Sequence, residues 1–292
     1  MGDAAVELVA LETAQIWTDT TGNGDTAVVL CHGGPGLSDN LAPVASMIED
    51  IAVVHRYDQR GGGRSTGDGQ FTVSQFVEDL ESLRVHWGHA SWIVGGHSWG
   101  GWLSLMYALE HPARVSAIIT IGMPPPPSEG WKASYQHARD SRLTTDEREF
   151  FEDIRRRRRT GAPIAEDEEQ RWVRLNWRTD FADSSAVPDF SREPLFGFPA
   201  NYEVNRALVA DMETFAATHD LLAELTSIEV AALIVHGNGD PRPAPISAAG
   251  ALPNARLVRI AGAGHLPWLE QPTEVAQTLR GFVRGANHSS VG

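Results

Sequence analysis

The sequence contains a single cysteine, Cys31, among its 292 residues. One cysteine cannot form a disulfide within the chain, which excludes a small secreted fold held together by disulfides. We expect Cys31 to be a small buried residue at the end of a strand. The sequence also has no Cys/His cluster and no H-x-x-x-H spacing, so we predict no bound metal.

Long apolar runs are absent as well. No run approaches the ~18 apolar residues of a membrane-spanning helix. The first six residues, MGDAAV, have no basic segment followed by an apolar stretch, and Val6 stands where a myristoylation motif has Ser or Thr. We therefore expect a soluble, cytoplasmic protein that does not bind membranes.

Basic residues are in the minority. Lys and Arg number 24 against 38 Asp and Glu, which gives a formal net charge of −14 at pH 7. Nucleic acids and anionic membranes both select for basic patches, so this charge argues against either as a partner. We expect a small-molecule or short-peptide substrate, and the sequence leaves the oligomeric state open.

The one run of like charge is basic and covers residues 155–159 in IRRRRRTG. Thr144 and Glu147 form a capping box that predicts the start of a helix, and Gly161 predicts its end. The arginines then lie in the last turns, where cations complement the helix dipole, and acidic residues 166–169 follow closely. We interpret the run as a solvated, charge-paired helix, with nucleic-acid binding as the alternative.

Short apolar runs rich in β-branched residues alternate with helical patterns along the chain. Runs that are apolar throughout are typical of strands buried on both faces of a parallel sheet. A capping box at Thr72 and Gln75 predicts one helix, and apolar residues at helical spacing after Pro272 predict another. This order indicates an α/β fold with a mostly parallel central sheet flanked by helices. The predicted strands are residues 27–30, 51–54, 92–94, 115–121, 231–235 and 256–260.

The alternation stops after IGMPPPP. Residues 124–225 contain no clear buried strand and are rich in charge, Trp and helix-forming residues, and the strand pattern resumes at AALIVHGNGD. We therefore predict an α/β core formed by residues 1–123 and 226–292, interrupted by a helical insertion over residues 124–225. Three tryptophans of the insertion would suit a hydrophobic substrate pocket: Trp131, Trp172 and Trp177.

The sequence GGHSWGG, residues 95–101, places Ser98 between glycines directly after a predicted strand. A helix interior disfavours glycine, whereas a sharp strand-to-helix turn needs small residues because the backbone approaches other elements closely. GHSWG fits G-x-S-x-G, the pattern of a strained turn that exposes a nucleophilic serine. A serine in a glycine-rich turn without a catalytic role is the alternative.

A serine hydroxyl needs a histidine to take its proton and an acid to orient that histidine. With a serine on this kind of turn, the acid and then the histidine follow along the chain, each in a loop after a strand. Asp240 occupies the first position, in HGNGDPR, and His265 the second, in AGAGH. We predict Ser98 as nucleophile, Asp240 as acid and His265 as base, with a turn aspartate and a surface histidine as the alternatives.

The stretch CHGGPG, residues 31–36, predicts a rigid loop with accessible N–H groups after a strand. A tetrahedral oxyanion needs two such donors, and we assign them to the N–H groups of Gly34 and Trp99. The sequence has no G-x-x-x-x-G-K-[ST] phosphate loop and no G-x-G-x-x-G register at residues 95–101. We therefore predict no nucleotide or other cofactor.

Other polar residues beside these motifs have structural interpretations. We expect His97 to point away from the serine on the turn, and His32 and His236 to brace loops. We expect Asp58 and Arg60, in DQRGGGRS, to fix a loop beside the active site through an ion pair or hydrogen bonds.

Together, HGGPG, DQRGGGRS, GGHSWGG, HGNGD and AGAGHLPWLEQP resemble the proline iminopeptidase family of α/β-hydrolases. The resemblance covers the whole core in order, and HGGPG with DQRGxGRS is a specific pair. It implies a serine hydrolase with a helical cap over the active site, which fits the predicted insertion. It also implies release of N-terminal residues, often proline, with a cap glutamate that binds the free α-amine. The string NYEVNRAL supplies Glu203 for that role, with Glu213 in reserve.

We therefore predict a serine hydrolase that acts through an acyl-enzyme, as an aminopeptidase on short peptides or amino-acid amides. An esterase or lactonase acting on small apolar acyl compounds is the alternative, because His97 before the nucleophile is more typical of general esterases. A non-catalytic binding protein of this fold would be expected to have lost a triad residue, and none is lost. Dehalogenases and epoxide hydrolases carry aspartate where this chain has Ser98.

Overall fold

The computed structural model describes residues 5–185, 187 and 198–289. Its centre is an eight-stranded sheet with the order β1-β2-β4-β3-β5-β6-β7-β8. β2 runs antiparallel to both β1 and β4, and all other neighbours are parallel. The strands are β1 (Ala5–Leu11), β2 (Ala14–Gly22), β3 (Ala27–Cys31), β4 (Val53–Tyr57), β5 (Trp92–His97), β6 (Val115–Ile121), β7 (Ala231–Gly237) and β8 (Ala255–Ile260).

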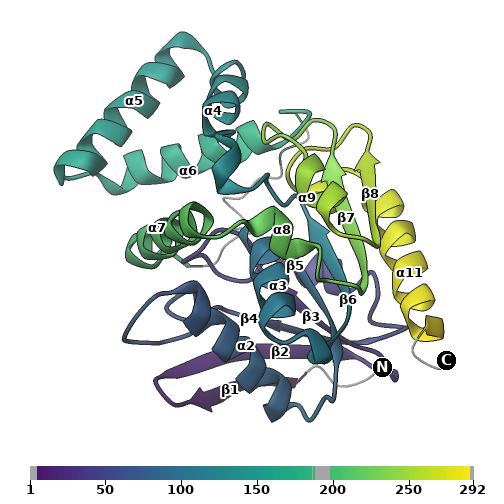
Figure 1. Cartoon of the computed structure of the whole chain (residues 1–292). Coiled ribbons are helices and arrows are strands. Elements are labelled where there is room, and N and C mark those ends of the chain that lie inside the picture. Colours follow the sequence, from purple (N-terminus) through teal and green to yellow (C-terminus); the bar gives the residue numbers. More distant parts are fainter. Residues whose placement is uncertain (1–4, 186, 188–197, 290–292) are drawn as a thin grey trace.

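Helices cover both faces of the sheet (Figure 1), which is why its central strands are apolar throughout. Alternate residues of β3 point to opposite faces: Val29 and Cys31 join one core cluster, Val28 and Leu30 the other. The core helices are α1 (Ala42–Ala45), α2 (Val73–His86), α3 (Trp99–Glu110), α9 (Ile246–Ala251), α10 (Pro267–Glu270) and α11 (Pro272–Ser289). The first cluster includes residues of α2, α3 and α9, and the second residues of α1, α10 and α11.

Five of the six predicted strands lie within observed strands, and the sixth is displaced. Residues 51 and 52 belong to a turn, and β4 begins at Val53 and continues to Tyr57. The prediction stopped at the polar residues His55 and Arg56, which are buried because β2 and the loop after β3 supply their partners. Arg56 pairs with two aspartates, and His55 Nδ1 lies 2.8 Å from Thr20 Oγ1.

The helices α4 to α8 follow β6 and precede β7 in the chain, and we refer to them together as the cap. In Figure 1, α4, α5 and α6 project beyond the sheet, and α7 runs below them toward α3. These helices are α4 (Lys132–Asp140), α5 (Thr145–Thr160), α6 (Glu166–Asp180), α7 (Tyr202–Thr218) and α8 (Leu221–Leu225). Among the helices that the structure describes, none combines the length and the apolar character of a membrane span.

The arginine run lies in the last turns of α5, as predicted. Thr144 and Glu147 form the capping box, and Gly161 ends the helix with φ +70°. Arg157 binds Glu168 at 2.6 Å, and the arginines at 155, 156 and 158 pair with acidic residues of α5 and α6. The run is a charge-paired helix surface.

Trp172 packs inside the cap rather than in a substrate pocket. Its ring stacks on Phe151 with 5.7 Å between centroids, and both join a small apolar cluster with Leu143 and Leu175. This cluster holds α5 against α6. Trp172 is therefore part of the cap's own core.

Candidate active site

Ser98 lies in the turn between β5 and α3 in a strained conformation. Its φ is +53° and its ψ −115°, and it is the only non-glycine residue with positive φ in the described part of the chain. Its N–H donates to the Ile121 carbonyl at 2.8 Å. A Cβ on Gly100 would lie 2.1 Å from the Cys31 carbonyl oxygen, so glycine is required there. The turn leaves Ser98 partly exposed at the carboxyl end of the sheet.

Among the described residues, the N–H groups of Gly34 and Trp99 donate to no partner within the protein. Trp99 is the first residue of α3, and the first N–H groups of a helix have no partner within it. Gln59 links the two segments: its amide donates to the His32 carbonyl at 2.8 Å, and its Oε1 accepts from the Trp99 indole at 3.0 Å. Two free N–H donors thus lie on segments that one buried side chain joins. The sequence analysis named both donors but did not identify Gln59.

His265 and Asp240 are hydrogen bonded to each other. The distance from His265 Nδ1 to Asp240 Oδ2 is 2.6 Å, and both side chains are buried. Because the carboxylate accepts from Nδ1, the hydrogen of a neutral imidazole lies there and Nε2 is left as a base. A Cβ on Gly122, which follows Ile121 at the end of β6, would lie 3.1 Å from His265 Nδ1. His265 and Ser98 therefore approach the same strand end.

Among the described residues, no hydrogen bond joins the Ser98 hydroxyl to His265 Nε2. Contacts of this kind are often long in a free enzyme and shorten when substrate binds. Burial alone would raise the pKa of Asp240, but His265, by charge and hydrogen bond, and the charge of Arg242 hold it well below its usual value. Asp240 is therefore ionised at neutral pH, as an acid that orients a histidine must be.

Three other histidines near the site are buried and hold backbone carbonyls. His97 Nε2 donates to the His265 carbonyl at 3.0 Å, and His236 Nε2 donates to the Arg242 carbonyl at 3.1 Å. His32 Nδ1 donates to the Gly33 carbonyl at 2.9 Å. Burial lowers the pKa of all three rings, so they are neutral braces. His32 and His236 thus brace loops as predicted, and His97 fixes the loop that carries His265.

Asp58 and Arg60 fix the DQRGGGRS loop through ion pairs and hydrogen bonds, as predicted. Asp58 accepts the Nε–H of Arg64 at 2.6 Å and the Asp39 N–H at 2.6 Å. Arg60 binds Asp79 of α2 through two nitrogens at 2.8 and 2.5 Å. Both side chains are therefore structural, and each has its own partner.

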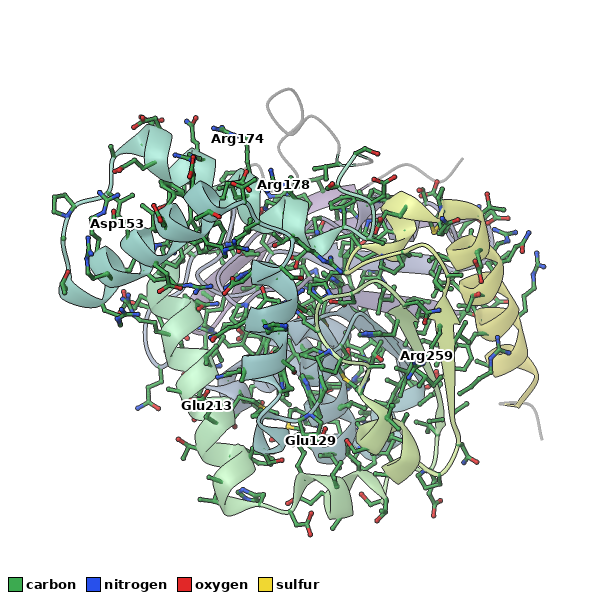
Figure 2. All side chains as sticks on the ribbon, turned by 90° about the horizontal axis from the view of Figure 1, so that it is seen from above. Glu129, Asp153, Arg174, Arg178, Glu213 and Arg259 are labelled. Atoms are coloured by element: carbon green, nitrogen blue, oxygen red, sulfur yellow. The ribbon has the colours of Figure 1, made fainter. Side chains whose placement is uncertain are left out.

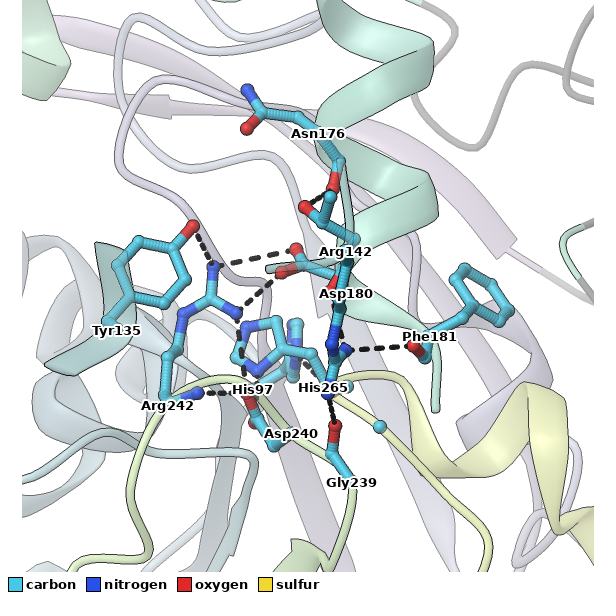
Figure 3. Close-up of polar contacts among 12 residues, drawn as sticks. His97, Tyr135, Arg142, Asn176, Asp180, Phe181, Gly239, Asp240, Arg242 and His265 are labelled. Carbon is cyan, nitrogen blue, oxygen red and sulfur yellow. Dashed lines mark hydrogen bonds and ion pairs between the residues drawn. The ribbon is translucent and has the colours of Figure 1, made fainter. Parts of the chain in front are cut away.

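The end of the cap helix α6 contacts the loops that carry Asp240 and His265 (Figure 3). Arg242 Nη1 lies 2.8 Å from Asp180 Oδ1, and the Asp180 carbonyl accepts the N–H of His265 at 2.7 Å. Arg142 donates to the carbonyls of Phe181 and Gly239 at 2.9 and 2.6 Å. No local sequence pattern marks these residues, because their partners are distant in the chain.

Glu203, the predicted amine-binding residue, has no contact with the triad among the described residues. It lies in the first turn of α7, its side chain is exposed, and its carboxylate has no hydrogen bond or ion pair there. The same turn docks on the loop of Gly34, because the Asn201 N–H donates to the Gly36 carbonyl at 2.7 Å. Glu213 lies on the outside of α7 and pairs with Lys132 (Figure 2).

One group of potential metal ligands occurs in the described part of the chain, away from the triad. Glu78, Glu110 and His111 each offer one ligand atom, and these atoms lie within 4.8 Å of one another. Both glutamates are exposed, and exposed acidic groups are common without a bound ion. The group lies on α2 and at the end of α3, and it has no contact with Ser98.

Curated relatives match part of the chain. The proline iminopeptidase of Neisseria meningitidis serogroup A is 36% identical over 116 residues, which cover 38% of this chain and 37% of that enzyme. The chain thus spans little more than a third of the length of such relatives.

Solved structures match almost the whole chain. A proline iminopeptidase from Mycobacterium smegmatis superposes with a TM-score of 0.70 at 19% identity, over 98% of this chain and 100% of that one. A thermophilic esterase from Thermogutta terrifontis gives 0.66 at 22% identity, over 98% and 99%. Likenesses at these identities establish a shared fold. The family profile described as alpha/beta hydrolase fold matches residues 26–272, and the chain therefore belongs to the α/β-hydrolase fold family.

Proposed function

We propose that the chain is a serine hydrolase that acts through an acyl-enzyme. The observation that carries this proposal is the buried hydrogen bond between His265 and Asp240 at 2.6 Å, beside the strained turn of Ser98. Asp240 holds His265 Nδ1, and His265 Nε2 has no hydrogen-bond partner among the described residues. A triad needs both.

In the proposed reaction Ser98 Oγ attacks the substrate carbonyl carbon while His265 Nε2 takes its proton. The carbonyl oxygen becomes an oxyanion that accepts hydrogen bonds from the N–H groups of Gly34 and Trp99. The tetrahedral intermediate then collapses, and the leaving amine or alcohol takes the proton from His265. Water hydrolyses the acyl-enzyme by the same route, and Asp240 holds the imidazolium in each step.

We further propose that the substrates are short peptides or amino-acid amides with a free N-terminus. The matching third of the chain is similar to proline iminopeptidases, and the first turn of α7 docks on the loop of Gly34. Glu203 lies in that turn, and its exposed carboxylate has no hydrogen bond or ion pair among the described residues, which supports its proposed role as the amine-binding group. An exposed carboxylate binds a cation weakly, which favours the esterase or lactonase alternative unless the substrate itself excludes water.

The test compares aminoacyl p-nitroanilides of proline and alanine, their N-acetylated forms, and p-nitrophenyl esters of several chain lengths. We expect turnover of the free-amine anilides and little of the acetylated ones. The Glu203 carboxylate is exposed, and exposed charge pairs contribute only about 0.2–1 kcal/mol, so Glu203→Gln should lower kcat/KM for the anilides by about 2- to 5-fold. The same variant should leave ester turnover unchanged, because a simple ester has no amine.

Glu213→Gln, on the same helix, is the matched control. We expect no selective loss from it because Glu213 is already paired with Lys132. Equal losses on anilides and esters in Glu203→Gln would contradict amine recognition by this residue. Turnover of esters alone by the unmodified protein would support the esterase alternative.

A further inference from the structure

The cap is bonded to the two loops that carry the acid and the base. Asp180, the last residue of α6, accepts the N–H of His265 through its carbonyl at 2.7 Å. A Cβ on Gly264 would lie 2.1 Å from that carbonyl oxygen, so glycine alone permits this approach. Glu270 accepts the N–H groups of Ala182 and Gly264 at 2.9 and 2.5 Å and ties the same two segments together.

The side chain of Asp180 forms a second link, through Arg242, to the acid. Arg242 donates its backbone N–H to Asp240 Oδ1 at 2.8 Å, and its Nη1 lies 3.4 Å from the same oxygen. Asp240 Oδ2 remains for His265. Arg242 Nη1 also lies 2.8 Å from Asp180 Oδ1, and its Nη2 lies 3.3 Å from the Tyr135 hydroxyl. The guanidinium thus bridges a cap carboxylate and the carboxylate of the triad (Figure 3).

All of these charges are shielded from water. The side chains of Arg242, Asp180 and Asp240 are 15%, 10% and 0% exposed. At low exposure, a charge left without its partner acts strongly on its neighbours. Arg242 without Asp180 would compete with His265 for Asp240 and add positive charge beside the imidazole. Asp180 without Arg242 would add negative charge there.

We infer that Asp180 and Arg242 are a pair of positioning residues through which the cap orients Asp240 and His265 and sets the pH range of catalysis. This inference rests on the proposed serine hydrolase function. It makes the cap part of the catalytic apparatus as well as a cover for the substrate. Neither residue touches the reacting atoms.

Several charged or titratable groups lie near His265. The loop after β7 contributes Asp240 and Arg242, and the other elements contribute His236, His97, Tyr135, Asp180 and Glu270. The neutral histidines and Tyr135 carry no charge near pH 7, and Glu270 is held by backbone N–H groups. Asp180 and Arg242 carry opposite charges that cancel near His265. Substitution of either residue leaves the other as an uncompensated charge.

The experiment measures the rate at which a fluorophosphonate probe labels Ser98 between pH 5 and 9. Asp180→Asn should move the acidic limb of this profile to lower pH, because the unpaired Arg242 disfavours the imidazolium. Arg242→Gln should move it to higher pH, because the unpaired Asp180 favours the imidazolium. A nearby charge of this kind shifts a titration by about one pH unit. The double variant should restore the limb of the unmodified protein.

We also expect each single variant to lower the plateau rate about 10-fold through misplacement of Asp240. Asp140→Asn is the matched control: this aspartate ends α4, pairs with an arginine and has no bond to the triad loops. Opposite shifts that cancel in the double variant cannot arise from misfolding. Shifts in the same direction, or unmoved limbs, would overturn the inference while Ser98 is still labelled. No labelling of the unmodified protein would instead overturn the proposed function.

Discussion

Ser98 combines a backbone conformation that costs free energy with neighbours that make it tolerable. A non-glycine residue at φ +53° stores roughly 1–3 kcal/mol of strain. The strain persists because the Ser98 N–H is bonded to Ile121 and because the Gly101 N–H donates to the Ser98 carbonyl at 3.0 Å. The strained turn brings the Ser98 hydroxyl out of a fully buried strand into a partly exposed position.

His55 is another single residue whose environment has a measurable consequence. Its Nε2 lies 2.8 Å from His89 Nε2, and its Nδ1 lies 2.8 Å from Thr20 Oγ1. Two facing nitrogens at this distance can hold one hydrogen between them. Burial, aided by the charge of His89, lowers the pKa of His55 to about 3. The folded protein therefore keeps this ring neutral at pH values where the unfolded chain protonates it.

We predict that this residue makes the protein less stable in mild acid. Between about pH 6.5 and pH 3 the unfolded state binds the proton and the folded state does not, so stability falls as pH falls. From pH 7 to pH 5 the loss from His55 is about 2 kcal/mol of unfolding free energy. Urea unfolding at both pH values measures it, and His55→Gln should show a smaller loss than the unmodified protein.

The exposed His137 provides the control, because His137→Gln should leave the pH dependence unchanged. Other buried histidines keep part of the loss in every variant. The same loss of stability from pH 7 to pH 5 in His55→Gln as in His137→Gln would show that His55 is not held neutral by the fold.

At the scale of elements, the cap depends on the pairing of α5 with α6. Glu147 accepts the Thr144 N–H at 2.9 Å in the capping box and binds Arg178 of α6 through two contacts at 2.8 and 2.6 Å. Arg178, the larger cause, and the Thr144 N–H lower the pKa of Glu147 to about 2. One carboxylate thus starts one helix and fastens it to the next.

We predict that Glu147→Gln loosens this helix pair by about 0.5–1.5 kcal/mol, the usual contribution of such a hydrogen bond. Hydrogen exchange measured by mass spectrometry should show faster exchange of the amides in α5 and α6. Glu149→Gln makes the same chemical change at an exposed position of α5 and should have almost no effect. Indistinguishable exchange in the two variants would contradict the proposed coupling of α5 and α6.

The elements that the sequence predicts well are those with one dominant pattern. Strands buried on both faces are apolar throughout, and the capping box and Gly161 define α5. β1 and β2 were not predicted, because they form an antiparallel hairpin at the sheet edge in which β1 is mostly exposed and β2 is rich in polar residues. The strand predicted at residues 51–54 was displaced from β4 because His55 and Arg56 are buried through partners in β2 and through Asp39. No local pattern reveals such partners.

At the scale of the whole molecule, the sheet order explains why the chain order of Ser98, Asp240 and His265 was informative. β5, β7 and β8 lie in the parallel part of the sheet, so the loops after them open at the same edge. The link through Asp180 was not predictable in this way. It joins a cap helix to a loop 62 residues further along the chain, and only the folded structure brings the two together.

The central claim is that Ser98 is the nucleophile of a triad with His265 and Asp240. The most direct test is labelling by a fluorophosphonate probe, with the modified residue located by mass spectrometry. We predict one labelled residue, Ser98, and loss of both labelling and turnover in Ser98→Ala, where kcat should fall by about 10⁶. Ser134→Ala, at an exposed serine of the cap, should label normally. Labelling at another residue, or near-normal turnover by Ser98→Ala, would contradict the account.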